Sequence, residues 1–428
     1  MLLEFSVGNY RSFGEEVTLS FASSAQRSRH GVLDASNRRA VEGGLHVLLS
    51  AAVFGSNASG KSNLFRALHF MKAFVLDSAR EGQAGDSIGV TPFRLHPDLR
   101  QEPSSFEIVL LLGGVRYRYG FEVDNEKVHR EWLLQCKQRE REVFRREGAT
   151  FTGLKSMHLE ALERMTRPNA LFLSVAAHFN DERATALLAW FKRIGFLGGI
   201  HDVAKPFTAR QLAEKTPLAG PIQDLLRRLD LDLSSLSTTR LERAHLPGDM
   251  PEELVSLVMK TGGYVVTTRH AIRDDDGQVV GEDWFDLETE ESGGTNKLFA
   301  LAGPLVATLR EGSVLVVDEF DARLHPVISR AIIELFHDPT SNPHGAQLLV
   351  LTHDTNLLDR RLFRRDQVWF VEKNRQAQSD LYALAEIRER NDAAFETAYL
   401  QGRYGAIPFP RGLVAAFSET ATPVEAAG

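Results

Sequence analysis

Apolar residues recur along this chain with two periods, and the change from one to the other separates predicted strands from predicted helices. Leu3, Phe5 and Val7 alternate with other positions near the N-terminus, and a similar alternation resumes over residues 17–21. A period of two turns one face of an extended strand toward a core. Residues 2–21 are therefore predicted to form two short strands around a turn.

The same alternation returns beyond residue 100 and predicts a larger antiparallel sheet. Residues 106–112 and 115–123 flank Gly113-Gly114, a dipeptide typical of two-residue hairpin turns. Residues 128–135 and 142–146 continue the alternation as a meander.

Continuous apolar runs predict a second kind of strand, buried on both faces as in a parallel sheet. One run covers residues 47–54, and Leu64, Leu68, Met71 and Val75 follow it at helical spacing. Further runs at residues 314–317 and 348–351 predict two more buried strands. The expected fold class is α/β, with a mixed or parallel sheet, an antiparallel β-subdomain and a helical insertion at residues 155–262.

Composition narrows the class of protein. With 428 residues, of which 43% are hydrophobic, the chain can form two or three domains or one large domain with an insertion. No apolar run is long enough to cross a bilayer, and Glu4 stands where a signal peptide carries basic residues, so we expect a cytoplasmic protein. The single cysteine, Cys136, excludes internal disulfides and cysteine metal clusters within one chain.

Charge argues against nucleic-acid binding over the whole surface, because the formal net charge is −7. Two groups of arginines leave local binding open: Arg139, Arg141, Arg145 and Arg146, and Arg360, Arg361, Arg364 and Arg365. Acidic residues lie among them. A solvated face is therefore the preferred interpretation, and a nucleic-acid patch is the alternative.

The strongest motif lies between the 47–54 run and the helix that follows it. Residues 55–62 fit Gly-x-x-x-x-Gly-Lys-[Ser/Thr] in the strand-to-helix context that a phosphate-binding loop requires. Glycines let successive backbone N–H groups turn toward phosphates, and the helix adds the positive end of its dipole. We expect Lys61 to contact the β- and γ-phosphates and Ser62 to bind Mg²⁺. The candidate nucleotide-binding residues here are Gly55, Ser56, Asn57, Ala58, Ser59, Gly60, Lys61, Ser62 and Asn63.

A second group of candidate residues follows predicted elements near residue 300. Ser292 and Gly294 precede a helix with an apolar face, and a helix N-terminus suits a phosphate. The 314–317 strand ends in Asp318 and Glu319, where carboxylates can hold Mg²⁺ and polarise an attacking water. His353 follows the 348–351 strand, so it is expected at the same edge of the sheet.

The order of these motifs resembles that of the ABC-type ATPases, in particular the branch that contains RecF and the SMC proteins. A closer resemblance is to the RloA-like bacterial ATP-binding proteins, relatives of the OLD ATPases, many of which belong to phage-defence operons. Similar segments are spread over nearly the whole chain: residues 9–13, 55–64, 106–122, 169–174, 292–295, 318–321, 324–326, 352–353 and 399–408.

The resemblance implies an ATPase whose cofactors are ATP and Mg²⁺, with ATP sandwiched between two protomers. Ser292 and Gly294 of one protomer would face the phosphate loop of the other, in a homodimer or a higher homo-oligomer. Glu319 would orient the attacking water, and His353 would sense the γ-phosphate. Arg11, in a loop between the first two strands, is either an ordinary turn residue or a further nucleotide contact.

The chain departs from the family pattern in three places. Glu291 and Thr295 replace the leucine and glutamine of the transporter signature, and Arg323 stands where relatives often have a small residue. The glutamine that usually contacts Mg²⁺ has no identified counterpart.

The resemblance also implies a division of the chain into parts. We expect a first ATPase lobe at residues 1–154, the helical insertion at 155–262, a second ATPase lobe at 263–415 and a flexible tail at 416–428.

Three functions remain open at the level of sequence. The preferred one is a dimeric sensor or scaffold that controls a separate effector, a nuclease or toxin, in anti-phage defence. A RecF-like or SMC-like repair ATPase that clamps DNA is the alternative. A self-contained nuclease of OLD type is set aside, because the roughly seventy residues after His353 are too few for another metal-dependent domain.

Overall fold

The computed structural model describes residues 1–28, 30–81, 83–154, 159–198, 204–229, 235–243, 248–261, 263–388 and 394–408. The predicted tail at residues 416–428 lies outside this range. In the described part of the chain, no helix combines the length and apolar character needed to span a membrane.

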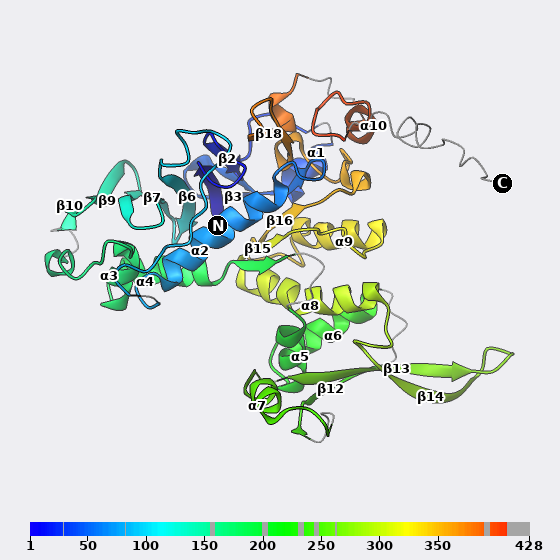
Figure 1. The fold of residues 1–428 in the computed structure, drawn as a ribbon. Helices are drawn as coiled ribbons and strands as arrows, with labels where there is room; N and C mark the ends of the chain where they lie inside the picture. The colour runs from blue at the N-terminus through cyan, green and yellow to red at the C-terminus, as the bar shows by residue number, and fades with distance from the viewer. Residues whose placement is uncertain are drawn as a thin grey trace, which may run out of the picture.

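A six-stranded mixed sheet forms the centre of the molecule (Figure 1). Neighbouring strands are parallel except for the last pair, β17 and β18. In spatial order the strands are β11 (Gly195–Leu197), β15 (Val314–Val317), β16 (Gln347–Leu351), β5 (Ser50–Phe54), β17 (Val368–Lys373) and β18 (Ser379–Ala383).

This sheet is buried on both faces, which explains why its inner strands are continuously apolar. Along β5, Ala51 and Val53 belong to one hydrophobic core, whereas Ala52 and Phe54 belong to the other. The first core contains the apolar face of α2 (Lys61–Asp77), and the second contains those of α8 (Gly293–Glu311) and α9 (Pro326–His337). Successive side chains of a strand point to opposite faces, so α2 lies on one face and α8 and α9 lie on the other.

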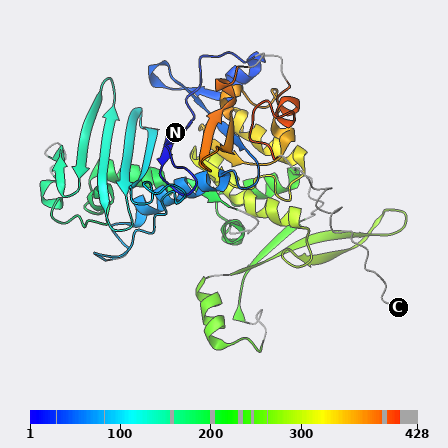
Figure 2. The same ribbon diagram turned by 45° about the horizontal axis from the view of Figure 1, so that its top comes forward.

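A seven-stranded antiparallel sheet lies beside the central sheet, as Figure 2 shows, where its strands between residues 104 and 152 are cyan to teal. Its spatial order is β10 (Thr150–Thr152), β9 (Glu140–Glu147), β8 (Val128–Cys136), β7 (Val115–Val123), β6 (Ser104–Leu112), β1 (Leu2–Gly8) and β2 (Val17–Ser20). The predicted hairpin at Gly113-Gly114 is confirmed, since Leu112 pairs with Val115. The expected α/β fold with an antiparallel β-subdomain is present.

Residues 155–262 are largely helical in their described part, but they do not form one separate insertion. Their helices are α3 (Phe172–His178), α4 (Glu182–Lys192), α5 (Lys205–Ala213), α6 (Ala219–Arg228) and α7 (Glu252–Thr261). Helix α4 ends at Lys192, and Phe196 lies in β11, which pairs with β15 of the central sheet. A three-residue edge strand is too short to show a period in sequence, so the parallel pairing could not be predicted.

A three-stranded antiparallel sheet projects from the body of the molecule beyond α5 and α6 (Figure 1). It consists of β12 (Ser235–Arg240), β13 (Tyr264–Arg273) and β14 (Val279–Asp286). Residues 274–277 form the turn between β13 and β14, in which the Gly277 N–H donates to the Asp274 carbonyl at 2.9 Å.

The remaining α-helices and strands have six residues at most. They are α1 (Gly31–Ser36), β3 (Arg38–Ala40), β4 (His46–Leu48) and α10 (Phe395–Leu400). The segment 399–408 docks on the central sheet through Tyr399, whose ring stacks on Phe370 of β17 and whose hydroxyl donates to the Ala406 carbonyl.

Candidate nucleotide-binding site

Three neighbouring parallel strands carry the candidate residues to one edge of the central sheet. β15, β16 and β5 are adjacent, with Val317 level with Val350 and Leu351 level with Val53. The residues that follow these strands therefore emerge side by side at their carboxyl ends, which is the usual ligand edge of a parallel sheet.

The phosphate-binding loop turns tightly from β5 into α2, and its glycines are needed for space. A Cβ on Gly55 would overlap the Val371 carbonyl and would lie 2.7 Å from Ser59 Oγ. Gly60 has a φ of +120°, and a Cβ there would lie 2.8 Å from Ser12 Oγ and would overlap Ser379 Oγ. Neither position can carry a side chain without displacing its neighbours.

Two serines outside the motif, Ser12 and Ser379, support this loop through hydrogen bonds. Ser379 Oγ donates to the Ser59 carbonyl at 2.5 Å, and the Ser379 N–H donates to the Ser12 carbonyl at 2.7 Å. Ser12 Oγ in turn accepts a hydrogen bond from Asn63 Nδ2 at 2.8 Å. Sequence reasoning missed both serines, although Ser12 lies in the 9–13 segment that carries part of the family resemblance.

A cavity of about 460 Å³ lies over the loop and gathers most of the predicted site. Asp318, Glu319 and His353 line it, and Arg66 and Lys373 add two cations that the sequence did not single out. The other lining residues are Ser56, Asn57, Ala58, Ser59, Gly60, Lys61, Ser62, Asn63 and Leu351.

Lys61 lies folded over the loop it belongs to. Its ammonium donates to the Gly55 carbonyl at 2.7 Å and to the Ser56 carbonyl at 3.3 Å. Burial lowers its pKa to about 8, while the charges of Asp318, Asp321 and Glu319 act in the opposite direction. The lysine is therefore still mainly protonated at neutral pH and can attract phosphate oxygens.

His353 is held close to Lys61 by Asp321. The carboxylate of Asp321 accepts from the His353 N–H at 3.1 Å and from Thr352 Oγ1 at 2.6 Å. His353 Nδ1 lies 3.4 Å from Lys61 Nζ. Burial first, and then the charge of Lys61, lower the pKa of His353, so its imidazole is neutral at physiological pH.

Asp318 and Glu319 differ in environment. Asp318 is buried, and its Oδ1 accepts from the Glu319 N–H at 3.0 Å. Glu319 is partly exposed and has a φ of +49°, in the left-handed region that non-glycine residues rarely adopt. Strained backbone of this kind occurs often at functional sites.

The residues around the cavity fit a magnesium–nucleotide ligand. Asp318 and the Ser62 hydroxyl line the same cavity, and Mg²⁺ usually takes few protein oxygens beside phosphate and water. No cluster of three His, Cys, Asp or Glu side chains suited to a metal occurs in the described residues. Ser59 Oγ is buried at the cavity without a hydrogen-bond partner among those residues, a position that a phosphate oxygen could satisfy.

Ser292 and Gly294 do not line this cavity. They begin α8 as predicted: Ser292 is its N-cap, and Ser292 Oγ accepts from the Thr295 N–H at 3.1 Å. The side chain of Arg323 lies against Gly293, where a Cβ would be 3.2 Å from Arg323 Cδ.

Arg11 also does not line the cavity. It is exposed, its Nε donates to the Tyr10 hydroxyl at 3.1 Å, and its guanidinium lies over the Tyr10 ring.

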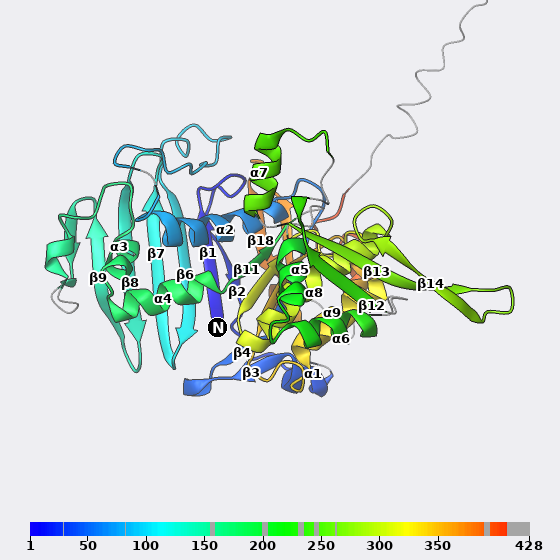
Figure 3. The same cartoon turned by 90° about the horizontal axis from the view of Figure 1, so that it is seen from below.

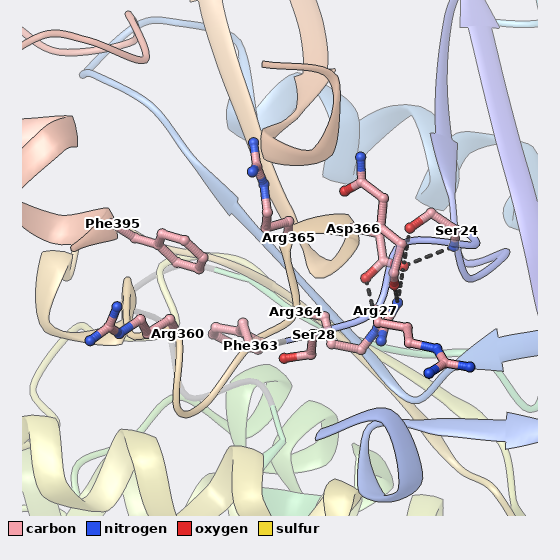
Figure 4. Close-up of a pocket in the computed structure, with 10 residues that line it drawn as sticks. Ser24, Arg27, Ser28, Arg360, Phe363, Arg364, Arg365, Asp366 and Phe395 are labelled. Atoms are coloured by element: carbon pink, nitrogen blue, oxygen red, sulfur yellow. Dashed lines mark hydrogen bonds and ion pairs between the residues drawn. The ribbon is translucent and has the colours of Figure 1, made fainter. Parts of the chain in front are cut away.

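Each of the two arginine groups contains a buried residue with a structural role, which neither sequence interpretation included. Arg146 is 3.9 Å from Glu131 and donates to the Ala170 carbonyl at 2.7 Å. Arg364 pairs with Asp34 and Asp366 inside a pocket, and Figure 4 shows the guanidinium groups of Arg27, Arg360 and Arg365 pointing in different directions around it. These guanidinium groups do not converge on one point.

Three solved structures match this chain at 12% sequence identity. The match to RecF with ATPγS, described as a recombination mediator protein of the RecFOR pathway, covers 90% of this chain and 98% of the RecF chain, with a TM-score of 0.30. The match to RecF with ATP covers 89% of this chain and 97% of the RecF chain, with a TM-score of 0.31. CbiO1 of Clostridium perfringens, part of the ABC transporter complex CbiONQ, covers 98% and 100%, with a TM-score of 0.29.

A search of curated proteins found no match. The sequence profile of one protein family, in contrast, matches residues 50–359, a range that includes the phosphate-binding loop, Asp318, Glu319 and His353. The chain therefore belongs to the AAA-domain family described as putative AbiEii toxin, Type IV TA system.

Proposed function

We propose that this protein binds and hydrolyses ATP between two copies of the chain and thereby controls a separate effector in bacterial defence against phage. The observation that carries the proposal is the division of the site. Phosphate-loop residues, Asp318, Glu319 and His353 line one cavity, whereas Ser292 and Gly294 lie outside it at the start of α8. A second protomer would supply these two residues to the open side of the cavity.

The proposed chemistry depends on positioning and charge rather than on a covalent intermediate. Lys61 would contact the β- and γ-phosphates, with the loop N–H groups around them, and Glu319 would orient the attacking water. His353 would donate a hydrogen bond to a γ-phosphate oxygen. Ser62 and Asp318 would hold Mg²⁺, which would neutralise part of the phosphate charge.

The role in defence rests on the RloA-like and OLD-related resemblance together with the family description, which names a toxin of a toxin–antitoxin system. The acidic net charge favours a protein effector over the alternative, a RecF-like ATPase that clamps DNA. The genes beside this one discriminate between the two: a nuclease or toxin gene supports defence, and replication genes support repair.

The catalytic assignment is tested by two substitutions in the purified protein. Lys61→Ala should weaken ATP binding, and Glu319→Gln should bind ATP but hydrolyse it slowly and accumulate as a closed dimer. If both variants hydrolyse ATP like the parent protein, the assignment is wrong.

The shared site is tested by mixing two inactive variants. Lys61→Ala removes a phosphate contact, and Ser292→Arg blocks the surface offered to the partner. A mixed dimer has one intact site of two, formed by the phosphate loop of the Ser292→Arg protomer and Ser292 of the Lys61→Ala protomer. When equal amounts assort at random, about half of the dimers are mixed, so the mixture should recover about a quarter of the parent activity. A mixture no more active than either variant alone would contradict a site built from two protomers.

A further inference from the structure

The outer part of the β13–β14 hairpin extends away from the rest of the molecule (Figures 1 and 3). We call residues 269–284 the arm. Every residue from 271 through 280 is exposed, whereas Val266, at the base of the hairpin, is buried in the second hydrophobic core. The base is therefore anchored, and the arm stands in solvent.

Large apolar side chains are concentrated on this arm. Ile272 is 47% exposed, Val279 56%, Val280 62% and Trp284 49%, and these are four of the twelve exposed large hydrophobic residues in the described chain. Trp284 pairs with Arg269 across the hairpin, and the Arg269 guanidinium lies 5.8 Å from the centre of its ring. Exposed apolar side chains grouped in this way are typical of interaction surfaces, and tryptophan is enriched among residues that dominate binding energy.

The arm also belongs to the most acidic part of the chain. The 28 residues from Tyr264 to Glu291 contain nine acidic and two basic side chains, a net charge of −7. The whole chain has 57 acidic and 50 basic residues, so the remainder has 48 of each and is balanced. The net negative charge of the protein therefore resides in this stretch, which repels nucleic acid and anionic lipid and attracts a basic protein surface.

The base of the arm is connected to the start of α8. Glu291 Oε1 accepts from Thr268 Oγ1 at 2.5 Å and lies 2.6 Å from His270 Nε2. Glu291 immediately precedes Ser292, the N-cap of α8. A shift of β13 would therefore be transmitted to Ser292 through one side chain.

We propose that the arm is the docking surface for a basic protein partner, with Trp284 and Val280 as apolar contacts and the aspartates of the tip as charge contacts. Docking would adjust the position of Ser292 and so regulate the shared nucleotide site. The regulatory part rests on the function proposed above, whereas docking itself does not depend on it.

The first experiment identifies what touches the arm. A photo-crosslinking amino acid replaces Val280 in the full chain, produced in cells of the source organism, and the matched control carries it at Val32, which is 76% exposed on α1. We expect a protein crosslink at Val280 that is absent at Val32. No crosslink at Val280, a crosslink to nucleic acid, or a crosslink to a second copy of this chain overturns the proposal.

The second experiment measures the affinity of the purified crosslinked protein for the purified parent chain and its variants. Trp284→Ala should weaken binding by at least about tenfold. Asp274→Asn, Asp275→Asn and Asp276→Asn together should weaken it about tenfold at low salt and much less at high salt, because screening already removes the charge attraction there. Val32→Ala should bind like the parent. Unchanged affinity in the two arm variants overturns the proposal.

The rate of ATP hydrolysis, measured in the absence of the partner protein, distinguishes a failure of the docking inference from a failure of the proposed function. The arm variants should hydrolyse ATP at the parent rate. If the parent protein does not hydrolyse ATP, the proposed function fails while the affinity measurement still decides docking. If hydrolysis is intact and the arm variants bind normally, the docking inference alone fails.

Discussion

The carboxylate of Asp321 accepts a hydrogen bond from the backbone N–H of His353 at 3.1 Å. Asp321 lies two residues beyond Glu319, after β15, and His353 follows the neighbouring strand β16. The contact therefore joins the two loops that carry the candidate catalytic residues. It also fixes the backbone of His353 beside Lys61.

Asp321→Ala should lower the rate of ATP hydrolysis by at least about tenfold while nucleotide affinity changes little. The substitution leaves the His353 N–H and the Thr352 hydroxyl without their acceptor, so the His353 loop loses its fixed position. Asp321→Asn keeps an acceptor oxygen and should retain most of the activity. The check is kcat and KM measured separately for both variants, and equal kcat values in the two would argue against a positioning role.

Gly60→Ala should abolish nucleotide binding and should destabilise the fold more than an ordinary glycine substitution. Its Cβ would meet Ser12 and Ser379, and the backbone has a φ of +120°. Gly148→Ala is the matched control: its φ is +58°, but no atom lies within 4 Å of the added Cβ. The control should cost about 1 kcal/mol, the ordinary penalty of a left-handed alanine. Thermal unfolding with and without ATP measures both effects, and equal losses of stability would contradict the packing around Gly60.

Stability should fall as the pH is lowered below about 6.5, in part because of His337. This histidine is buried, its Nε2 lies 2.7 Å from Ser50 Oγ, and burial lowers its pKa to about 3. Between pH 6.5, the ordinary pKa that His337 has in the unfolded chain, and its pKa of about 3 in the folded chain, the unfolded chain binds a proton that the folded chain does not. The free energy of unfolding therefore decreases by up to about 1.4 kcal/mol for each unit of decreasing pH in this window.

His337→Gln should reduce the change of the free energy of unfolding with pH, whatever the substitution does to stability at neutral pH. His96→Gln, which changes an exposed histidine, is the control and should leave the slope unchanged. Urea unfolding at several pH values between 7 and 5 provides the comparison, and the same slope in the parent and His337→Gln would show that His337 does not contribute.

Asp366→Ala should destabilise the fold by about 3 kcal/mol, because it removes one of two carboxylates that neutralise a buried guanidinium. Arg364 is 3% exposed and pairs with both Asp34 and Asp366. Arg361→Ala, in the same arginine group but at an exposed position, should have little effect. Thermal unfolding of both variants tests this structural interpretation. If Asp366→Ala lost DNA binding while its stability stayed unchanged, the interpretation would be contradicted.

Much of the architecture could be predicted from local pattern, since each inference needed only neighbouring residues. The 106–112 and 115–123 strands could be placed because period-two alternation and Gly113-Gly114 occur within one continuous stretch. The start of α8 could be placed because an N-cap serine precedes an apolar helical face. The phosphate-binding loop was identifiable because its glycines satisfy a local backbone requirement.

Contacts between distant parts of the chain were decided only by the tertiary structure. Ser12 and Ser379 support the loop from opposite ends of the sequence, and β11 joins the central sheet from within a largely helical stretch. The buried role of Arg364 depends on Asp34, which is 330 residues away. The physical reason is the same in each case: such contacts depend on the packing of whole elements, whereas periodicity and motifs report only the conformation and burial of the residues that carry them.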